Sequence, residues 1–219
     1  MLDRWTLPLV KKPWRAIAVK LAAVGIRANE VTVAGFVVGL LAIPLLAGQY
    51  YQLALFTMAV NRIADGIDGE LARIQGNTDR GAFLDIVLDF IFYSAVILGF
   101  ALANPTANAL PAAALLFGFM GTGSSFLAFA IIAEKHQLKN MVYQHKGFHY
   151  LDGLAEGTET ILFFMLFCLL PDYFNILAWV FAGVCYITTT TRVCSGYQTI
   201  KMTEQKATSD QTKLDPKDI

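Results

Sequence analysis

The sequence predicts an all-α integral membrane protein with six transmembrane helices, preceded by an amphipathic helix at the membrane interface. Of its 219 residues, 56% are hydrophobic and only 16% are charged, which is too apolar for an ordinary soluble domain. The hydrophobic residues form separate runs, several of them close to the roughly 20 residues that cross a bilayer. The basic residues lie at the two ends of the chain and at every second junction between these runs.

Residues 1–27 predict a helix that lies along the cytoplasmic membrane surface. From Pro13 onward, apolar side chains recur at helical spacing, and basic side chains occupy the opposite face. The apolar set is Trp14, Ile17, Leu21 and Val24, and the basic set is Lys11, Lys12, Arg15 and Lys20. This pattern is typical of an interfacial helix, and a helix packed against the rest of the protein would show it equally well. No secretory signal peptide is visible.

Residues 28–202 are expected to form the transmembrane domain. Its six predicted spans are 31–47, 51–64, 82–103, 109–133, 160–170 and 174–191. The three predicted outer turns, GQYYQ, ANPTANA and PDYFN, contain no Lys or Arg, so the positive-inside rule places both termini and the other junctions in the cytoplasm. Gly35 and Gly39 form a GxxxG pattern, which indicates close helix packing within the chain or across a dimer. Residues 203–219 predict a disordered cytoplasmic tail.

Composition limits the range of functions. The formal net charge is zero, so the chain as a whole gives no indication of nucleic-acid binding, and its basic surface is expected to face the lipids of the inner leaflet. Cys168, Cys185 and Cys194 lack the spacing of metal ligands and are expected to be reduced structural thiols. The sequence shows no internal repeat and no matched pair of broken helices of the kind that transporters contain.

Four aspartates indicate the chemistry most clearly. Asp65 and Asp68 are three residues apart at the end of the second span, and Asp85 and Asp89 are four apart at the start of the third. Each pair lies within about 60° around its helix. The short connection should make the two helices antiparallel neighbours, so that all four carboxylates can meet near the cytoplasmic face. Helix caps would explain one Asp at each helix end, but not two on one face of each helix.

Carboxylates at one site repel one another unless they are protonated, solvated or bound to cations. Two divalent cations would neutralise four of them, and oxygen ligands favour Mg²⁺ or Mn²⁺, with Ca²⁺ as an alternative. Mg²⁺ held by carboxylates usually completes its shell with substrate phosphates, and paired metals stabilise a departing diphosphate. Gly66 and Gly69 would leave room for a substrate, and Arg73 can reach phosphate as a planar fork. The cluster therefore predicts a site for a phosphorylated substrate at the membrane surface.

Two segments, DGIDGELAR at 65–73 and GAFLDIVLD at 81–89, resemble the signature of the CDP-alcohol phosphotransferase family. That signature is DxxDGxxAR, a short gap and then GxxxDxxxD, and every signature position is met. The NEVT segment at 29–32 resembles the P-N-x-x-T opening of the family's first span, with Ala28 in place of the proline. The GTGSSF and EGTET segments resemble a bacterial inner-membrane branch of the family.

The resemblance implies an enzyme that transfers a phosphatidyl or other phospho-alcohol group from a CDP-alcohol, with CDP-diacylglycerol as the expected donor, to a hydroxyl acceptor and releases CMP. It also implies a homodimer. It implies that Asp65, Asp68 and Asp85 bind metal, and that Asp89 both contacts metal and acts as the base. The residues that match CDP-alcohol-binding positions are Asn29, Thr32, Gly69, Ala72, Arg73 and Gly81.

The acceptor site is weakly marked. Arg192 late in the sixth span and Glu159 at the start of the fifth are candidates for acceptor binding, and a structural pair between them is the competing interpretation. The cations near the junction of spans four and five are expected to be solvated or to contact lipid headgroups, and the HKGFH segment only weakly indicates a metal site. These cations are Lys135, Lys139, His145, Lys146 and His149.

Two other functions remain open at this point. An intramembrane Mg²⁺-dependent prenyltransferase also uses Asp-rich motifs and would release pyrophosphate, but its motifs normally lie on separated helix pairs. A divalent-cation transporter would explain the Asp cluster, but not Gly69, Ala72 and Arg73 at their fixed spacing.

Overall fold

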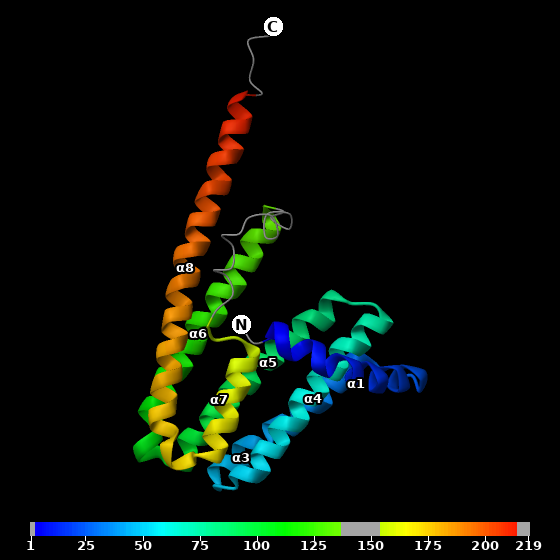
Figure 1. Cartoon of the computed structure of the whole chain (residues 1–219), viewed down its shortest axis with the longest axis vertical. Helices are drawn as coiled ribbons and strands as arrows, with labels where there is room; N and C mark the ends of the chain where they lie inside the picture. Colours follow the sequence, from blue (N-terminus) through cyan, green and yellow to red (C-terminus); the bar gives the residue numbers. More distant parts are fainter. Residues whose placement is uncertain (1–2, 137–153, 214–219) are drawn as a thin grey trace.

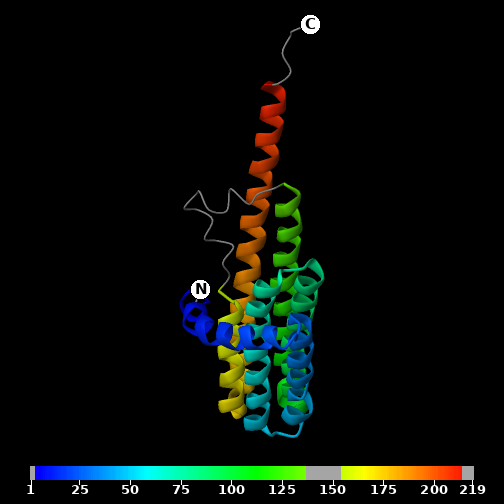
Figure 2. The ribbon, with the colours of Figure 1, turned by 90° about the vertical axis from the view of Figure 1, so that its right-hand side faces the viewer.

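The computed structural model describes residues 3–136 and 154–213, and the side chains of 11–136 and 154–205. Over these residues the chain is helical and contains no strand. Most of the helices run up and down along one bundle axis, while the first lies across the bundle (Figures 1 and 2). The elements are α1 (Asp3–Ala23), α2 (Ala28–Leu40), α3 (Ala42–Ala47), α4 (Tyr51–Gln75), α5 (Asp79–Ala103), α6 (Pro105–Lys135), α7 (Gly157–Leu169), the 3-10 turn η3 (Pro171–Tyr173) and α8 (Phe174–Lys213).

Four helical segments of the described chain are long and apolar enough to cross a membrane. They are Ala28–Ala47, Asp79–Ala103, Pro105–Lys135 and Pro171–Gln205. Helix α7 is apolar but has only 13 residues, and the second half of α4 carries the charged residues of the signature. The prediction of an all-α integral membrane protein is therefore confirmed, while the count of six spans stays a prediction.

Several helix boundaries differ from the predicted spans. The first span is divided at Leu41 into α2 and α3, because Pro44 has no N–H to donate to the carbonyl of Leu40. Helix α4 continues eleven residues past the predicted end at Ala64, to Gln75, so Asp65 and Asp68 lie within a regular helix. Helix α8 continues through the first part of the expected tail, since the segment TEQKATSDQTK contains neither Gly nor Pro.

Part of the junction between spans four and five lies outside the described residues. The candidates that fall there are Lys139, His145, Lys146 and His149, with the whole HKGFH segment. Their expected roles stay predictions. All three cysteines are free, as expected, although Cys194 is exposed rather than buried.

The core of the bundle is aromatic. Six phenylalanines are fully buried: Phe92, Phe100, Phe164, Phe167, Phe174 and Phe181. The Phe100 ring stacks on Phe174 with centroids 4.6 Å apart, which joins α5 to the start of α8. This core begins at Phe92, one turn beyond Asp89, so the packed apolar interior starts directly beneath the charged residues of the signature.

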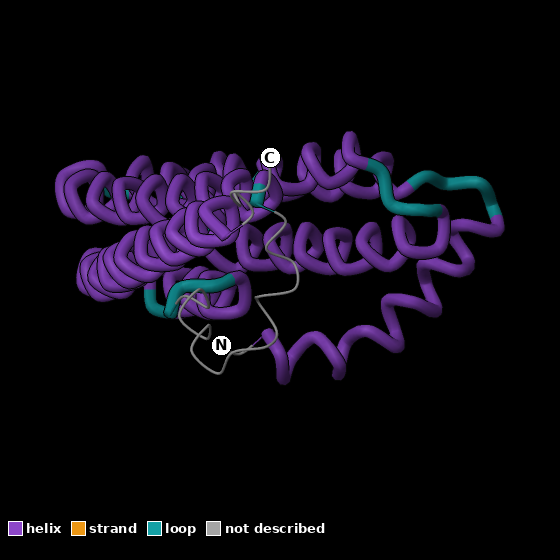
Figure 3. Tube along the Cα trace, turned by 90° about the horizontal axis from the view of Figure 1, so that it is seen from above, coloured by secondary structure: helices purple, strands orange, loops and turns teal. Residues whose placement is uncertain are grey.

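Helix α1 packs across the end of α4 and runs along one side of the bundle (Figure 3). Ala18 of α1 is buried against Ile67 and Leu71 of α4. The Trp14 ring lies so close to Gly66 that a Cβ on this glycine would overlap it. The structure thus corrects one interpretation, because Gly66 makes room for α1 and not for a substrate. Packing on the protein is confirmed for α1, and its position at the membrane surface stays a prediction.

The GxxxG pair brings α2 close to α4 within the chain. A Cβ on Gly35 would lie 2.5 Å from Ala64 Cβ, and a Cβ on Gly39 would lie 2.9 Å from Asn61 Nδ2. Helix α2 also packs against α5. It therefore lies against both helices that carry the aspartates, and its first turn faces the site.

Candidate active site

Three of the four predicted aspartates face one another. Carboxylate oxygens of Asp65, Asp68 and Asp85 all lie within 4.8 Å of each other. For comparison, two oxygens on opposite sides of a bound Mg²⁺ are about 4.2 Å apart, since each lies about 2.1 Å from the ion. The carboxylate oxygens are therefore only slightly farther apart than they would be around Mg²⁺. Asp68 is only 5% exposed, and its Oδ2 has no hydrogen-bond partner among the described residues. A buried carboxylate oxygen without a partner is costly, so this three-aspartate group fits a divalent cation after small side-chain movements.

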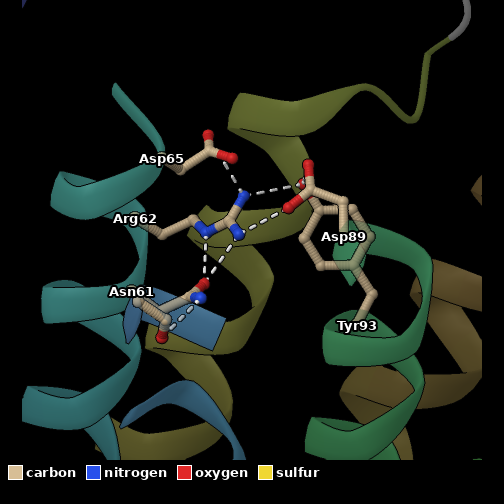
Figure 4. Close-up of polar contacts among 6 residues, drawn as sticks. Asn61, Arg62, Asp65, Asp89 and Tyr93 are labelled. Carbon is tan, nitrogen blue, oxygen red and sulfur yellow. Dashed lines mark hydrogen bonds and ion pairs between the residues drawn. The ribbon is translucent and has the colours of Figure 1, made fainter. Parts of the chain in front are cut away.

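The fourth aspartate, Asp89, is held by Arg62 of α4. Arg62 Nη2 lies 2.6 Å from Asp89 Oδ1, and Arg62 Nη1 lies 3.6 Å from Asp65 Oδ2 (Figure 4). Tyr93 Oη donates a longer hydrogen bond of 3.4 Å to Asp89 Oδ2. The structure therefore groups Asp89 with Arg62 and Tyr93 at one side of the three-aspartate group.

The sequence reasoning assigned no role to Arg62, although a signal was present. Arg62 follows the apolar run YYQLALFTMAV and is therefore an arginine inside a membrane-associated helix, where such a residue needs a partner. It also lies three residues before Asp65, which places it on the same face of α4 as the aspartates. Asn61, which contacts the same guanidinium, was missed as well.

A cavity of about 820 Å³ opens beside the three-aspartate group, at the end of the bundle where α4 turns into α5. Its walls are the turn between α1 and α2, the start of α2, the end of α4 and the start of α5. Asp68 and Asp85 line it, and Arg27 and Arg80 add positive charge that the sequence reasoning did not assign. All six residues that match CDP-alcohol-binding positions line it: Asn29, Thr32, Gly69, Ala72, Arg73 and Gly81.

Polar side chains fix the walls of this cavity. Gln75 Nε2 donates to the Ile26 carbonyl at 2.6 Å, and its Oε1 accepts from the Ala28 N–H at 3.1 Å, which ties the end of α4 to the start of α2. Thr78 caps α5 by accepting from the Gly81 N–H at 3.2 Å. A Cβ placed on Gly69 would have no neighbour within 4 Å, so this signature glycine borders open space in the cavity.

Arg73 is held in the cavity wall by a buried glutamate. Arg73 Nη1 donates to Glu70 Oε1, and Arg15 Nη1 of α1 lies 4.0 Å from Glu70 Oε2. Glu70 is only 1% exposed, whereas the Arg73 side chain is 58% exposed. The planar guanidinium therefore lies at the cavity surface, where it can pair with phosphate oxygens.

The two acceptor candidates lie on other helices. Arg192 Nη1 of α8 donates to the Thr122 carbonyl of α6 at 3.2 Å, and its guanidinium lies 5.7 Å from the centre of the Phe126 ring. Glu159 is in the first turn of α7. Neither residue lines the cavity of about 820 Å³, so their part in acceptor binding stays a prediction.

Comparison with known proteins tests the predicted family. The family model described as CDP-alcohol phosphatidyltransferase matches residues 26–191. The chain is 51% identical over 206 residues to the inner membrane protein YnjF of Escherichia coli, covering 94% of this chain and 100% of that protein. It is also 38% identical over 98 residues to archaetidylinositol phosphate synthase of Pyrococcus horikoshii, covering 44% of this chain and 52% of that enzyme.

Solved structures share the fold. The phosphatidylinositol phosphate synthase PgsA1 of Mycobacterium tuberculosis with CDP-DAG bound superposes with a TM-score of 0.62 at 20% identity, covering 84% of this chain and 93% of the other. The same protein in complex with manganese and citrate gives a TM-score of 0.63 at 20% identity, covering 84% and 88%. Neither the prenyltransferase nor the transporter alternative finds support in these comparisons.

The family resemblance in the signature segments is thereby confirmed over most of the chain. Members of this family transfer substituted phosphate groups in phospholipid biosynthesis, using a CDP-alcohol donor, an alcohol acceptor and divalent metal. The apolar helices and the E. coli relative indicate a multi-pass inner membrane protein. The chain belongs to the CDP-alcohol phosphatidyltransferase family.

Proposed function

We propose that the protein transfers a phosphatidyl group from CDP-diacylglycerol to the hydroxyl group of an alcohol and releases CMP. The observation that carries this proposal is that a single cavity is lined by all six predicted CDP-alcohol-binding residues and by two members of the three-aspartate group. Its volume of about 820 Å³ lies within the range typical of small-molecule sites. The choice of donor is supported by the similar M. tuberculosis structure with CDP-DAG bound.

The cavity offers complementary charge for the donor. Arg73 contacts the diphosphate, and Arg27 and Arg80 on the same walls add positive charge. Asp65, Asp68 and Asp85 would hold Mg²⁺ or Mn²⁺, and a cation bound there would stabilise the negative charge on the departing CMP. The similar structure in complex with manganese supports this choice of metal. The two ions expected from four carboxylates would require Asp89 as a further ligand.

Asp89 is the group that accepts the proton. The acceptor oxygen bonds to the phosphorus of the phosphatidyl group, and the bond from this phosphorus to the bridging oxygen breaks, so that CMP leaves with the electron pair. The acceptor's proton passes to Asp89. Asp89 Oδ1 is engaged by Arg62, whereas Oδ2 has only the 3.4 Å contact with Tyr93, which leaves Oδ2 lone pairs for the acceptor hydroxyl.

The proposed membrane arrangement has six spans, with α4 and α7 completing the four longer ones. The cavity, both termini and α1 lie at the cytoplasmic face, because the predicted outer turns contain no basic residue. The enzyme works as a homodimer, as the family resemblance implies. Arg192 and Glu159 are proposed to contact the acceptor.

The experiment is a donor and acceptor panel. Purified full-length protein is incubated with Mg²⁺, a set of alcohols and one of several CDP-alcohols, and CMP and the lipid product are measured by chromatography and mass spectrometry. CDP-diacylglycerol should give CMP together with a new phospholipid for at least one alcohol. Turnover confined to a water-soluble donor such as CDP-choline would overturn the proposed donor and keep the reaction class.

A further inference from the structure

We infer that the side-chain amide of Gln75 positions the donor site, in place of the proline that the P-N-x-x-T pattern has where this chain has Ala28. Gln75 lies outside both signature segments, two residues beyond Arg73. It is a positioning residue, because it acts on the donor through Asn29 and Thr32. Its effect on the donor rests on the proposed function, whereas its contact with the start of α2 can be measured without turnover.

The first observation is that α2 begins at a residue whose N–H needs a partner. Ala28 is the first residue of this helix, and the first N–H groups of a helix have no partner within it. A proline at this position has no N–H and already holds the φ angle of a helix, so it favours a helix start. The preceding residue, Arg27, has φ −94° and ψ 150°, which lies in the range that a following proline favours. The backbone here therefore suits a proline that the chain does not have.

The second observation is that the Gln75 amide supplies the missing restraint. Its Oε1 accepts from the Ala28 N–H at 3.1 Å, and its Nε2 donates to the Ile26 carbonyl at 2.6 Å. These two partners are 47 and 49 residues away from Gln75 in the sequence. One planar amide thus holds the backbone on both sides of Arg27, which fixes the direction in which the chain enters α2.

The third observation is that Ala28 connects Gln75 to the predicted donor-binding residues. Thr32 Oγ1 donates to the Ala28 carbonyl at 3.1 Å, so Ala28 is held by Gln75 at its N–H and by Thr32 at its C=O. Asn29 follows Ala28 directly. Asn29, Thr32 and Gln75 all line the cavity of about 820 Å³. A shift of the first turn of α2 would therefore move two predicted donor-binding residues relative to Arg73 on α4.

The test compares Gln75→Ala with a matched loss of an amide elsewhere. Gln75 is exposed at the last position of α4, and Ala favours a helix, so the variant should fold. The KM for CDP-diacylglycerol should rise about three- to tenfold, as expected when a hydrogen bond of ordinary strength is lost, with little change in kcat. A KM within about twofold of the parent, less than such a bond contributes, would overturn the inference.

Gln49→Ala is the control. Gln49 Nε2 donates to the Ala103 carbonyl at 3.1 Å, so it also joins two segments distant in the sequence, but it does not line the cavity of about 820 Å³. This variant should leave the KM for the donor unchanged. A rise in KM equal to that of Gln75→Ala would show a general loss of stability and would overturn the inference.

A proline at position 28 tests whether the amide takes its place. Adding Ala28→Pro to Gln75→Ala removes the N–H that has lost its partner and fixes φ at the start of α2. The double variant should therefore have a lower KM for the donor than Gln75→Ala alone. A purely structural role for Gln75 predicts no such rescue, and a KM that is not lowered would overturn the inference.

Hydrogen exchange measures the contact without any substrate. In the purified full-length protein in detergent, followed by mass spectrometry of overlapping peptides, the Ala28 amide should exchange faster in Gln75→Ala than in the parent. Exchange should stay as in the parent in Gln49→Ala. Unchanged exchange in Gln75→Ala would overturn the inference. If the parent releases no CMP from any CDP-alcohol, the proposed function fails instead, and exchange at Ala28 still decides whether Gln75 holds the start of α2.

Discussion

Gly81 of α5 and Asn29 of α2 approach each other so closely that a Cβ on Gly81 would lie 3.1 Å from Asn29 Oδ1. Both residues line the cavity of about 820 Å³. A side chain at Gly81 would therefore crowd Asn29, and also Thr78 Oγ1, which would lie 3.1 Å from the added Cβ. Gly183 of α8 offers a comparison, because a Cβ there would have no neighbour within 4 Å.

Replacing Gly81 by Ala should weaken donor binding more than it weakens the fold. The new methyl group would push Asn29 aside and narrow the cavity, so the KM for CDP-diacylglycerol should rise about tenfold, equivalent to about 1.4 kcal/mol. Gly183→Ala makes the same chemical change at a helical position without neighbours and should leave KM unchanged, with up to about 1 kcal/mol of added helix stability. Equal KM values for both variants would show that this wall does not contact the donor.

Replacing Glu70 by Gln should loosen Arg73. Glu70 is buried, and its carboxylate is the group that holds the Arg73 guanidinium in the cavity wall. A hydrogen bond to a charged group contributes about 1.5–3 kcal/mol, so the KM for the donor should rise by about tenfold or more with a smaller change in kcat. Arg15→Gln is the control, because Arg15 is 61% exposed and lies 4.0 Å from Glu70. A larger effect from Arg15→Gln would mean that α1, and not Glu70, fixes the site.

Asp89→Asn should remove the chemical step and keep donor binding. A positioned base contributes about 10²- to 10⁴-fold to turnover, so kcat should fall by that order while KM stays within about threefold, a margin far below the same 10² bound. Added Mg²⁺ should not restore the rate, since metal occupancy is not what fails. Asp79→Asn is the matched control, an exposed aspartate in the first turn of the same helix. If kcat in Asp89→Asn stays within threefold of the parent, the proton leaves by another group.

The orientation can be read from single cysteines in a cysteine-free background. Thr106 lies in a predicted outer turn and Lys201 at the opposite end of the bundle, and both are exposed. An impermeant thiol reagent added to intact cells should label Thr106→Cys and not Lys201→Cys, with the reverse in inverted membrane vesicles. Labelling of Lys201→Cys from outside the cell would contradict a cytoplasmic position for the C-terminal part of the chain.

Sequence reasoning located the site better than its internal contacts. The carboxylate spacing at 65–68 and 85–89 placed the aspartates on one face of each helix, and three of them do face one another. The glycines were harder to interpret, because Gly66 and Gly69 look alike in the sequence but have different surroundings. Gly66 lies against the Trp14 ring, whereas Gly69 borders open space. Which neighbour a glycine has depends on how α1 docks, and no local pattern contains that information.

The contacts of Arg62 and Glu70 were also beyond the sequence. Arg62 was visible as a charge in an apolar helix, but its bond to Asp89 depends on the approach of two helices with α2 packed against both. Glu70 occupies a position that the signature leaves open, and its near-complete burial follows from the packing of α1 across α4. The predicted spans missed the helix boundaries at Leu41 and Gln75, although their causes are local: Pro44 lacks an N–H, and Gly76 has a positive φ.

The most direct test of the central claim is metal-dependent release of CMP from CDP-diacylglycerol by the three-aspartate group. CMP and phospholipid should form in equal amounts, stop when the divalent metal is chelated and return with Mg²⁺ or Mn²⁺. Asp85→Asn should lower the rate at limiting metal at least about tenfold, because loss of groups that merely orient metal ligands already costs about 10- to 100-fold, whereas Asp79→Asn should leave it unchanged. Full CMP release in the presence of chelator, or movement of Mg²⁺ across liposomes without any CMP, would contradict this account.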